Sequence, residues 1–202
     1  MSKTDSIAVE HLDAVETARH GTTALGFWIY LMTDCILFAS LFATFAVLRG
    51  ATYGGPSGKE LFGMPFVLTE TLILLTSSFV CGLVLLGAKY NRTKLVILGL
   101  IITFLLGAAF LTLELTEFTH LVQDGHSWRA SAFLSAFFTL VGTHGAHISM
   151  GLIWIIVMIG QILKKGLVKG TIRRLTLFSL FWHFLDIVWI FIFTVVYLMG
   201  VL

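Results

Sequence analysis

The chain has 202 residues, of which 57% are hydrophobic and 12% charged, with a formal net charge of +2. Together with a mean hydropathy of +0.96, this composition lies far outside the range of soluble domains and predicts an integral membrane protein. The small net charge and the localised basic residues argue against a nucleic-acid-binding surface, so no nucleic-acid partner is expected.

Five apolar segments are long enough to cross a bilayer, which takes roughly 20 helical residues. They must be helical, because hydrocarbon offers the backbone no hydrogen-bond partners and none shows the alternation of a barrel strand. We therefore predict an all-α membrane protein with five transmembrane helices, at about 24–48, 65–88, 95–118, 132–163 and 175–202. The polar residues 1–23 are predicted to form a separate mobile or surface-lying segment on the cytoplasmic side.

The basic residues of the short loops predict the orientation, because Lys and Arg are enriched in loops that stay in the cytoplasm. They concentrate between the second and third segments and between the fourth and fifth, at Lys89, Arg92, Lys94, Lys164, Lys165, Lys169, Arg173 and Arg174. The loops after the first and third segments hold only Arg49, Lys59 and Arg129. We therefore expect a cytoplasmic N-terminus and a C-terminus in the periplasm or outside.

Several ionisable side chains lie inside the apolar segments, where such groups cost roughly 2.5 to 3.5 kcal/mol at the helix centre. Each can carry a function or form a structural polar contact between helices. The rise of a helix places Asp34 and Asp186 near the middle of the bilayer, and Glu70 and Glu117 near its outer surface. The full set is Asp34, Glu70, Glu114, Glu117, His144, His147, His183 and Asp186.

The two central aspartates differ in their nearby partners. His183 precedes Asp186 by three residues and so shares its helix face, which predicts a hydrogen-bonded pair that fixes the last helix in the bundle. Asp34 has no comparable partner, since its neighbours offer only Thr33 and Tyr30. It therefore either meets a polar group from another helix or stays protonated.

The histidines are not expected to bind haem or a metal ion. His144 and His147 lie about 24 to 29 Å from the cytoplasmic end of their helix, whereas His183 lies about 12 Å from the start of its own. A shared iron needs ligands at matching depth. A Glu-x-x-His pair, of the kind that builds diiron sites, occurs only at Glu117 and His120, near a helix end. We therefore expect no cofactor or metal in this chain.

Three stretches resemble subunit III of the haem-copper terminal oxidases: FWIYLMTDCILF, AFLSAFFTLVGTHGAHISMGLIW and LFWHFLDIVWIFIFTVVYLMG. The most specific are H-G-x-H-x-x-x-G, from His144 to Gly151, and W-H-F-x-D-x-V-W, from Trp182 to Trp189. Many subunits III have seven helices. The five expected here resemble the shorter form of bacterial quinol oxidases, and the first and last helices are most similar to the cytochrome bo ubiquinol oxidases.

The resemblance implies an accessory subunit in a bacterial inner membrane. Such a subunit packs against subunit I, which holds the haem and copper and reduces oxygen, and it lies beside the other oxidase subunits. Helices one and two would form one group and helices three to five another, with phospholipid in a V-shaped cleft between them. Family members support complex integrity and proton uptake.

The resemblance also suggests roles for the ionisable residues. Asp34 stands where many members carry a glutamate, and is therefore the candidate for supporting proton uptake. Candidates for structural polar pairs or for the lipid cleft are Glu70, Glu117, His144, His147, His183 and Asp186.

Two other classes of protein remain open. A stand-alone proton-coupled transporter would explain Asp34 and Asp186, although interrupted helices and duplicated halves are not evident. A membrane cytochrome would explain the histidines, although their depths do not match. An absorption spectrum of the isolated chain and co-purification of haem-containing partners would distinguish these classes.

Overall fold

The computed structural model describes residues 3–52 and 64–201, with side chains over 21–52 and 64–200. Within these ranges the chain is entirely helical apart from its connections, and no strand occurs. The elements in order are α1 (Lys3–Leu48), α3 (Met64–Lys89), α4 (Thr93–Gln123), α5 (Ala132–Lys165), α6 (Lys169–Ile192), the π-helix η1 (Phe193–Leu198) and α7 (Met199–Val201).

Five helical stretches of the described chain are long and apolar enough to cross a membrane, which confirms the predicted all-α protein with five spans. Some boundaries differ from the prediction. The third span continues to Gln123, and the last begins at Lys169. At the N-terminus, α1 begins at Lys3, so the first helix includes residues of the segment 1–23 that was predicted to be mobile or surface-lying.

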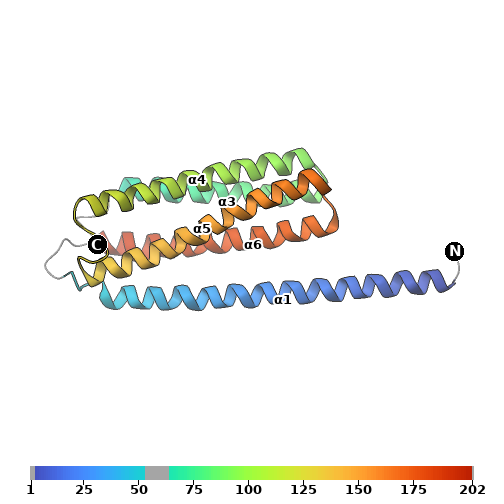
Figure 1. Ribbon diagram of the computed structural model, residues 1–202, viewed down its shortest axis with the longest axis horizontal. Helices are drawn as coiled ribbons and strands as arrows, with labels where there is room; N and C mark the ends of the chain where they lie inside the picture. Colours follow the sequence, from blue (N-terminus) through green and yellow to red (C-terminus); the bar gives the residue numbers. More distant parts are fainter. Residues whose placement is uncertain (1–2, 53–63, 202) are drawn as a thin grey trace. The chain divides into compact units, whose positions relative to one another are not determined.

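The chain divides into two compact units, Met1–Leu37 and Phe38–Leu202, with the boundary inside α1. In the second unit, α3 to α6 run side by side (Figure 1). The α3–α4 and α5–α6 connections lie at one end of this bundle, and the α4–α5 connection lies at the other. The end of α1 joins the bundle through aromatic contacts, such as Phe45 with Phe133 at 5.9 Å between ring centroids.

Helix α3 packs along α4 and also against α6. The α6 contact is polar as well as apolar, because Trp182 donates a hydrogen bond to Ser77 and Trp189 donates one to Thr71. The predicted division, with the first two helices in one group and the last three in another, is therefore wrong for α3. Hydrogen bonds between side chains more than 100 residues apart hold α3 to α6.

Trp182 lies at the centre of the bundle, where it is only 1% exposed. Its indole faces positions on α4 and α5 that have no side chain. A Cβ atom added at Gly107 would lie 2.9 Å from Trp182 Cη2, and one added at Gly151 would lie 2.8 Å from Cζ3. The two glycines therefore make room for one of the two tryptophans of the core.

We expect Gly151→Ala to destabilise the protein by about 1 to 3 kcal/mol, because the added methyl group overpacks the space that the Trp182 indole fills. The matched control is Gly160→Ala on the same helix, where a Cβ would meet no described atom within 4 Å. The thermal unfolding midpoint of the detergent-purified protein measures the difference. Equal midpoints for the two variants would show that the indole moves aside without cost.

Candidate functional site

A polar contact between α3 and α6 involves the histidine and aspartate that share a face of α6. The Ser78 hydroxyl lies 2.6 Å from His183 Nδ1 and also hydrogen-bonds the Asp186 carboxyl group. His183 and Asp186 additionally interact electrostatically. The two residues therefore belong to one polar group, as their spacing suggests, but a hydroxyl from another helix joins them.

Two tryptophans extend this contact along the same pair of helices. The Trp182 indole N–H donates to Ser77 Oγ, and the Trp189 indole N–H donates to Thr71 Oγ1, each at 3.1 Å. Sequence reasoning missed the three hydroxyl residues of α3 that make these contacts, Thr71, Ser77 and Ser78. The signal was present as the polar residues of LTETLILLTSS within an otherwise apolar span, but their partners could not be read from it.

A second polar group lies between α3, α4 and η1 and consists of Glu70, Glu114, Glu117 and Tyr197. Glu70 is fully buried and Glu114 is 2% exposed. The Tyr197 hydroxyl donates a hydrogen bond of 3.0 Å to Glu117 Oε2. Glu70 interacts electrostatically with Glu117 and Glu114. The structure thus brings together three acids from two helices, together with a tyrosine that the sequence analysis did not single out.

This acidic group is incompletely satisfied by the chain itself. Among the described residues, both carboxyl oxygens of Glu70 and Oε2 of Glu114 have no hydrogen-bond partner. Glu114 is also tightly enclosed, because a Cβ atom at Gly145 would lie 2.6 Å from its Oε1. Buried polar atoms normally have partners, so these carboxyl oxygens are an exception to the usual pairing. Tyr197 reaches it from a π-helix, a rare turn that is frequent at functional sites.

The two histidines of α5 lie in different surroundings. His144 is fully buried and stacks on Trp189, with ring centroids 5.2 Å apart, while the Phe110 ring stands edge-on to it at 5.9 Å. His147 Nδ1 donates to the Thr143 carbonyl oxygen at 2.8 Å. A ring on the end of α1 meets both of them, since Phe38 contacts the two imidazoles.

Asp34 belongs to the other unit, in α1. Tyr30, one helical turn earlier, hydrogen-bonds its carboxyl group. The expectation that Asp34 lacks a partner nearby in the sequence is therefore wrong. A tyrosine four residues away reaches it along the same helix face.

The described residues hold no group of three or more His, Cys, Asp or Glu side chains that could bind a metal ion. The site residues instead fall into four places: Asp34 on α1, the Ser78, His183 and Asp186 group, the acidic group, and the aromatic surroundings of His144 and His147. Chemically, these arrangements hold helices together through hydrogen bonds and stacked rings.

We expect Ser78→Ala to destabilise the protein by about 1 to 3 kcal/mol, because it leaves the partly buried His183 and Asp186 side chains without their shared hydroxyl. Thr76→Ala is the control, since the Thr76 hydroxyl is exposed and bonds only the Leu72 carbonyl of its own helix. Thermal unfolding midpoints of the two purified variants give the comparison. A midpoint for Ser78→Ala that does not fall below that of Thr76→Ala would mean that the hydroxyl does not fix α6.

Comparison with known proteins gives these contacts a family context. The family model for cytochrome c oxidase subunit III matches residues 3–201. Subunit 3 of the cytochrome bo(3) ubiquinol oxidase of Pseudomonas aeruginosa is 57% identical over 182 residues, which cover 90% of this chain and 87% of that protein. The cytochrome c oxidase subunit 3 of Bacillus sp. PS3 is 50% identical over 87% of this chain and 85% of its own length. The quinol oxidase subunit 3 of Bacillus subtilis is 48% identical over 87% of this chain and 86% of its own. With a match that runs through every helix, the chain belongs to the cytochrome c oxidase subunit III family.

Proposed function

We propose that the chain is the non-catalytic subunit III of a bacterial proton-pumping quinol oxidase of the cytochrome bo type. The observation that carries the proposal is the 57% identity, over nine-tenths of the chain, to a protein named as ubiquinol oxidase subunit 3. Haem and copper would be held by subunit I, which this chain would contact directly. No observation favours the stand-alone transporter.

The electron donor would be chosen by other subunits. Relatives of nearly equal similarity are named as subunits of a quinol oxidase and of a cytochrome c oxidase, at 48% and 50% identity. A subunit that bound the donor would have to distinguish a membrane-soluble quinol from a protein. The similarity across both classes supports a role that the two oxidases share, namely assembly and sustained turnover.

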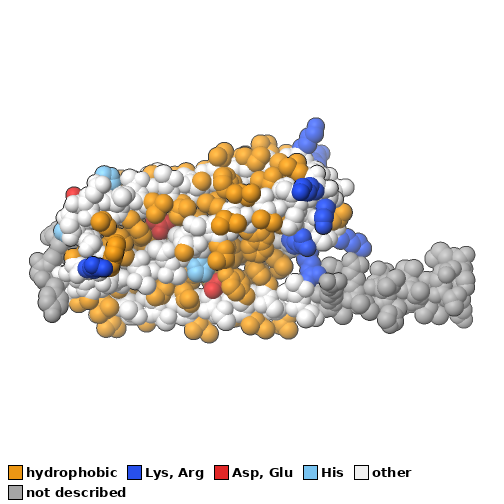
Figure 2. All heavy atoms as spheres, in the orientation of Figure 1, with side chains coloured by type: hydrophobic (Ala, Val, Ile, Leu, Met, Phe, Trp, Pro, Cys, Tyr) orange, Lys and Arg blue, Asp and Glu red, His pale blue; other side chains and the backbone are white. Residues whose placement is uncertain are grey.

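The basic end of the bundle would face the cytoplasm. Figure 2 shows most Lys and Arg side chains gathered at one end of the bundle, with a broad hydrophobic surface along its middle. The α3–α4 and α5–α6 connections lie at this end. Because positive charge is retained on the cytoplasmic side, this distribution supports a cytoplasmic N-terminus and a periplasmic C-terminus in the inner membrane.

The polar groups inside the bundle would serve its integrity. The contacts of Ser78 with His183 and Asp186, and of Tyr197 with Glu117, join helices that lipid alone would not hold in one register. Asp34 would support proton uptake by subunit I indirectly, because it is the one acid in the stretch that resembles the acidic helix of the family. Bound phospholipid would complete the subunit.

Removing this chain from the purified complex is expected to leave the haem and copper signals unchanged and to shorten sustained turnover, because the metals would belong to subunit I. Absorption spectra and oxygen consumption over time test both parts. The isolated chain should show neither a haem spectrum nor quinol oxidation. Loss of the metal signals when the chain is removed would contradict the proposal.

Asp34→Asn is expected to assemble normally and to keep most of the initial rate, because asparagine retains the size and hydrogen bonding of aspartate but cannot carry a proton. A deficit should appear during prolonged turnover or at high pH, where proton supply limits the rate. Asp34→Glu is the matched control, since it restores a titratable carboxyl group and should behave like the unmodified complex.

Oxygen consumption measured against pH and time distinguishes the outcomes for Asp34. Identical profiles for both variants would make Asp34 a packing residue. Complete loss of activity with intact haem would instead place it on an obligatory proton route.

A further inference from the structure

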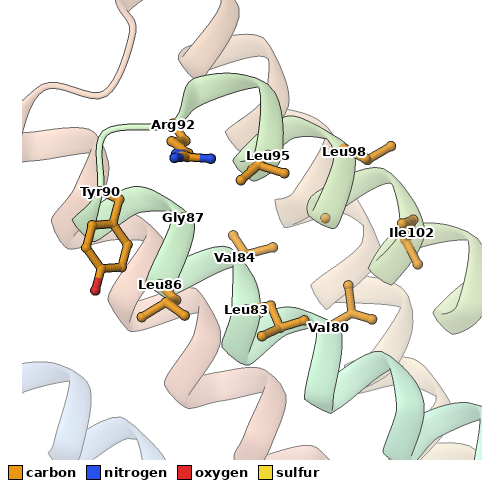
Figure 3. A pocket seen from close by; sticks show the side chains of 11 residues that line it. Val80, Leu83, Val84, Leu86, Gly87, Tyr90, Arg92, Leu95, Leu98 and Ile102 are labelled. Atoms are coloured by element: carbon orange, nitrogen blue, oxygen red, sulfur yellow. The ribbon is translucent and has the colours of Figure 1, made fainter.

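A groove on the surface of the bundle runs between α3 and α4, at the basic end. Its volume is about 550 Å³. Figure 3 shows side chains of both helices along it, with Val84 between the two helices and Tyr90 and Arg92 beside the connecting turn. The full lining is Val80, Leu83, Val84, Leu86, Gly87, Tyr90, Arg92, Leu95, Leu98, Gly99 and Ile102.

We propose that this groove binds an anionic phospholipid, with one acyl chain along its length and the phosphate group paired with Arg92. The inference deepens the proposed lipid binding by assigning it a place and a lipid class. It does not depend on which oxidase the chain serves.

The length of the groove fits an acyl chain of one leaflet. From Val80 to Tyr90 the helical rise amounts to about 15 Å, which is half of the roughly 30 Å hydrocarbon core of a bilayer. The groove thus runs from the headgroup level to about the middle of the membrane. A transmembrane helix would continue past this point and, over the same 15 Å, would occupy roughly 1,200 Å³. The groove therefore accommodates a narrower chain.

Two glycines shape the inner wall of the groove, because they have no side chain to fill it. Gly87 and Gly99 lie on it, and α3 and α4 approach closely there: a Cβ atom at Gly99 would lie 2.4 Å from Val84 Cγ2. The outer walls are apolar side chains that remain about half exposed, including Leu83 at 49% and Leu98 at 53%. In a membrane such a surface meets lipid, and its concave form favours one ordered chain over mobile ones.

The headgroup end carries the charge that selects an anionic lipid. Among the described residues that line the groove, Arg92 is the only charged one, and it is exposed. No ion pair to Arg92 is found in the described part of the chain, and the first turn of α4 contains no acidic residue. Lys89 and Lys94 flank the same turn and add to the positive field. A guanidinium group can bind two phosphate oxygens at once, and basic sites between helices bind anionic headgroups.

The test uses the assembled oxidase complex in phosphatidylcholine nanodiscs with a photoactivatable probe lipid. The probes are phosphatidylglycerol and phosphatidylcholine carrying the same diazirine on one acyl chain. After irradiation, mass spectrometry locates the label. We expect labelling within residues 80–102 that favours phosphatidylglycerol about fivefold, since one basic residue near the surface contributes on that order.

Two variants separate the parts of the site. Arg92→Gln should bring the ratio of the two probes close to one. Leu83→Trp should lower labelling by both probes several-fold, because the indole fills the groove. The controls are Lys164→Gln, which removes a charge at the same end of the bundle from α5, and Leu75→Trp, which adds an indole to an exposed position of α3 outside the groove. Both controls should label as the unmodified complex does.

If the two probes label the unmodified complex equally, and Arg92→Gln does not change their ratio, then the groove holds only ordinary boundary lipid and the proposal is overturned. Absence of label from residues 80–102 in the unmodified complex would mean that a neighbouring subunit covers the groove, which also overturns it. Haem content and quinol oxidation of the same samples report on the proposed function separately. An intact, active complex without the lipid preference would refute only the lipid site.

Discussion

The hydrogen-bonded contact between α3 and α6 is the constraint on which the rest of the bundle depends. Lipid tails are as apolar as leucine, so burial alone gives two membrane helices little reason to choose one mutual position. Here Ser77 receives the Trp182 indole, Ser78 lies beside His183, and Thr71 receives the Trp189 indole. These contacts fix α6 both along and around its axis, and thereby place the remaining face of Trp182 against the glycines of α4 and α5.

The aromatic residues of α6 connect this contact to the buried histidine. Trp189 donates to α3 through its nitrogen and presents its ring face to His144 of α5. The same indole stands at right angles to Phe110 of α4, with centroids 4.6 Å apart. One side chain thus meets three helices. Its position requires both the polar and the aromatic contacts, which is why the W-H-F-x-D-x-V-W stretch contains residues of both kinds.

The spans could be predicted from the sequence because bilayer thickness sets their length, and this requires no knowledge of partners. The helix ends could not, since Lys169 and Gln123 continue helices beyond the apolar windows by backbone hydrogen bonding alone. The packing of α3 against α6 could not be predicted either, because a serine in an apolar helix indicates a polar contact but not which helix supplies the partner.

The acidic group of Glu70, Glu114, Glu117 and Tyr197 could not be predicted for the same reason, since the sequence does not show which helices are neighbours. Glu70 and Glu117 were correctly assigned to spans, but their meeting depends on the adjacency of α3 and α4 and on the π-turn that delivers Tyr197.

Two hydroxyl groups of α3, those of Thr71 and Ser77, also bear on biosynthesis. The indoles that they accept from belong to the last span, more than 100 residues later, so α3 must enter the membrane long before these indoles arrive. Thr71 and Ser77 donate their hydroxyl protons to carbonyl oxygens of their own helix, at 2.8 Å to Val67 and 2.7 Å to Leu74. Their oxygens remain able to accept a second bond. In a newly inserted α3, the hydroxyl donors of Thr71 and Ser77 are therefore already satisfied within their own helix before α6 arrives.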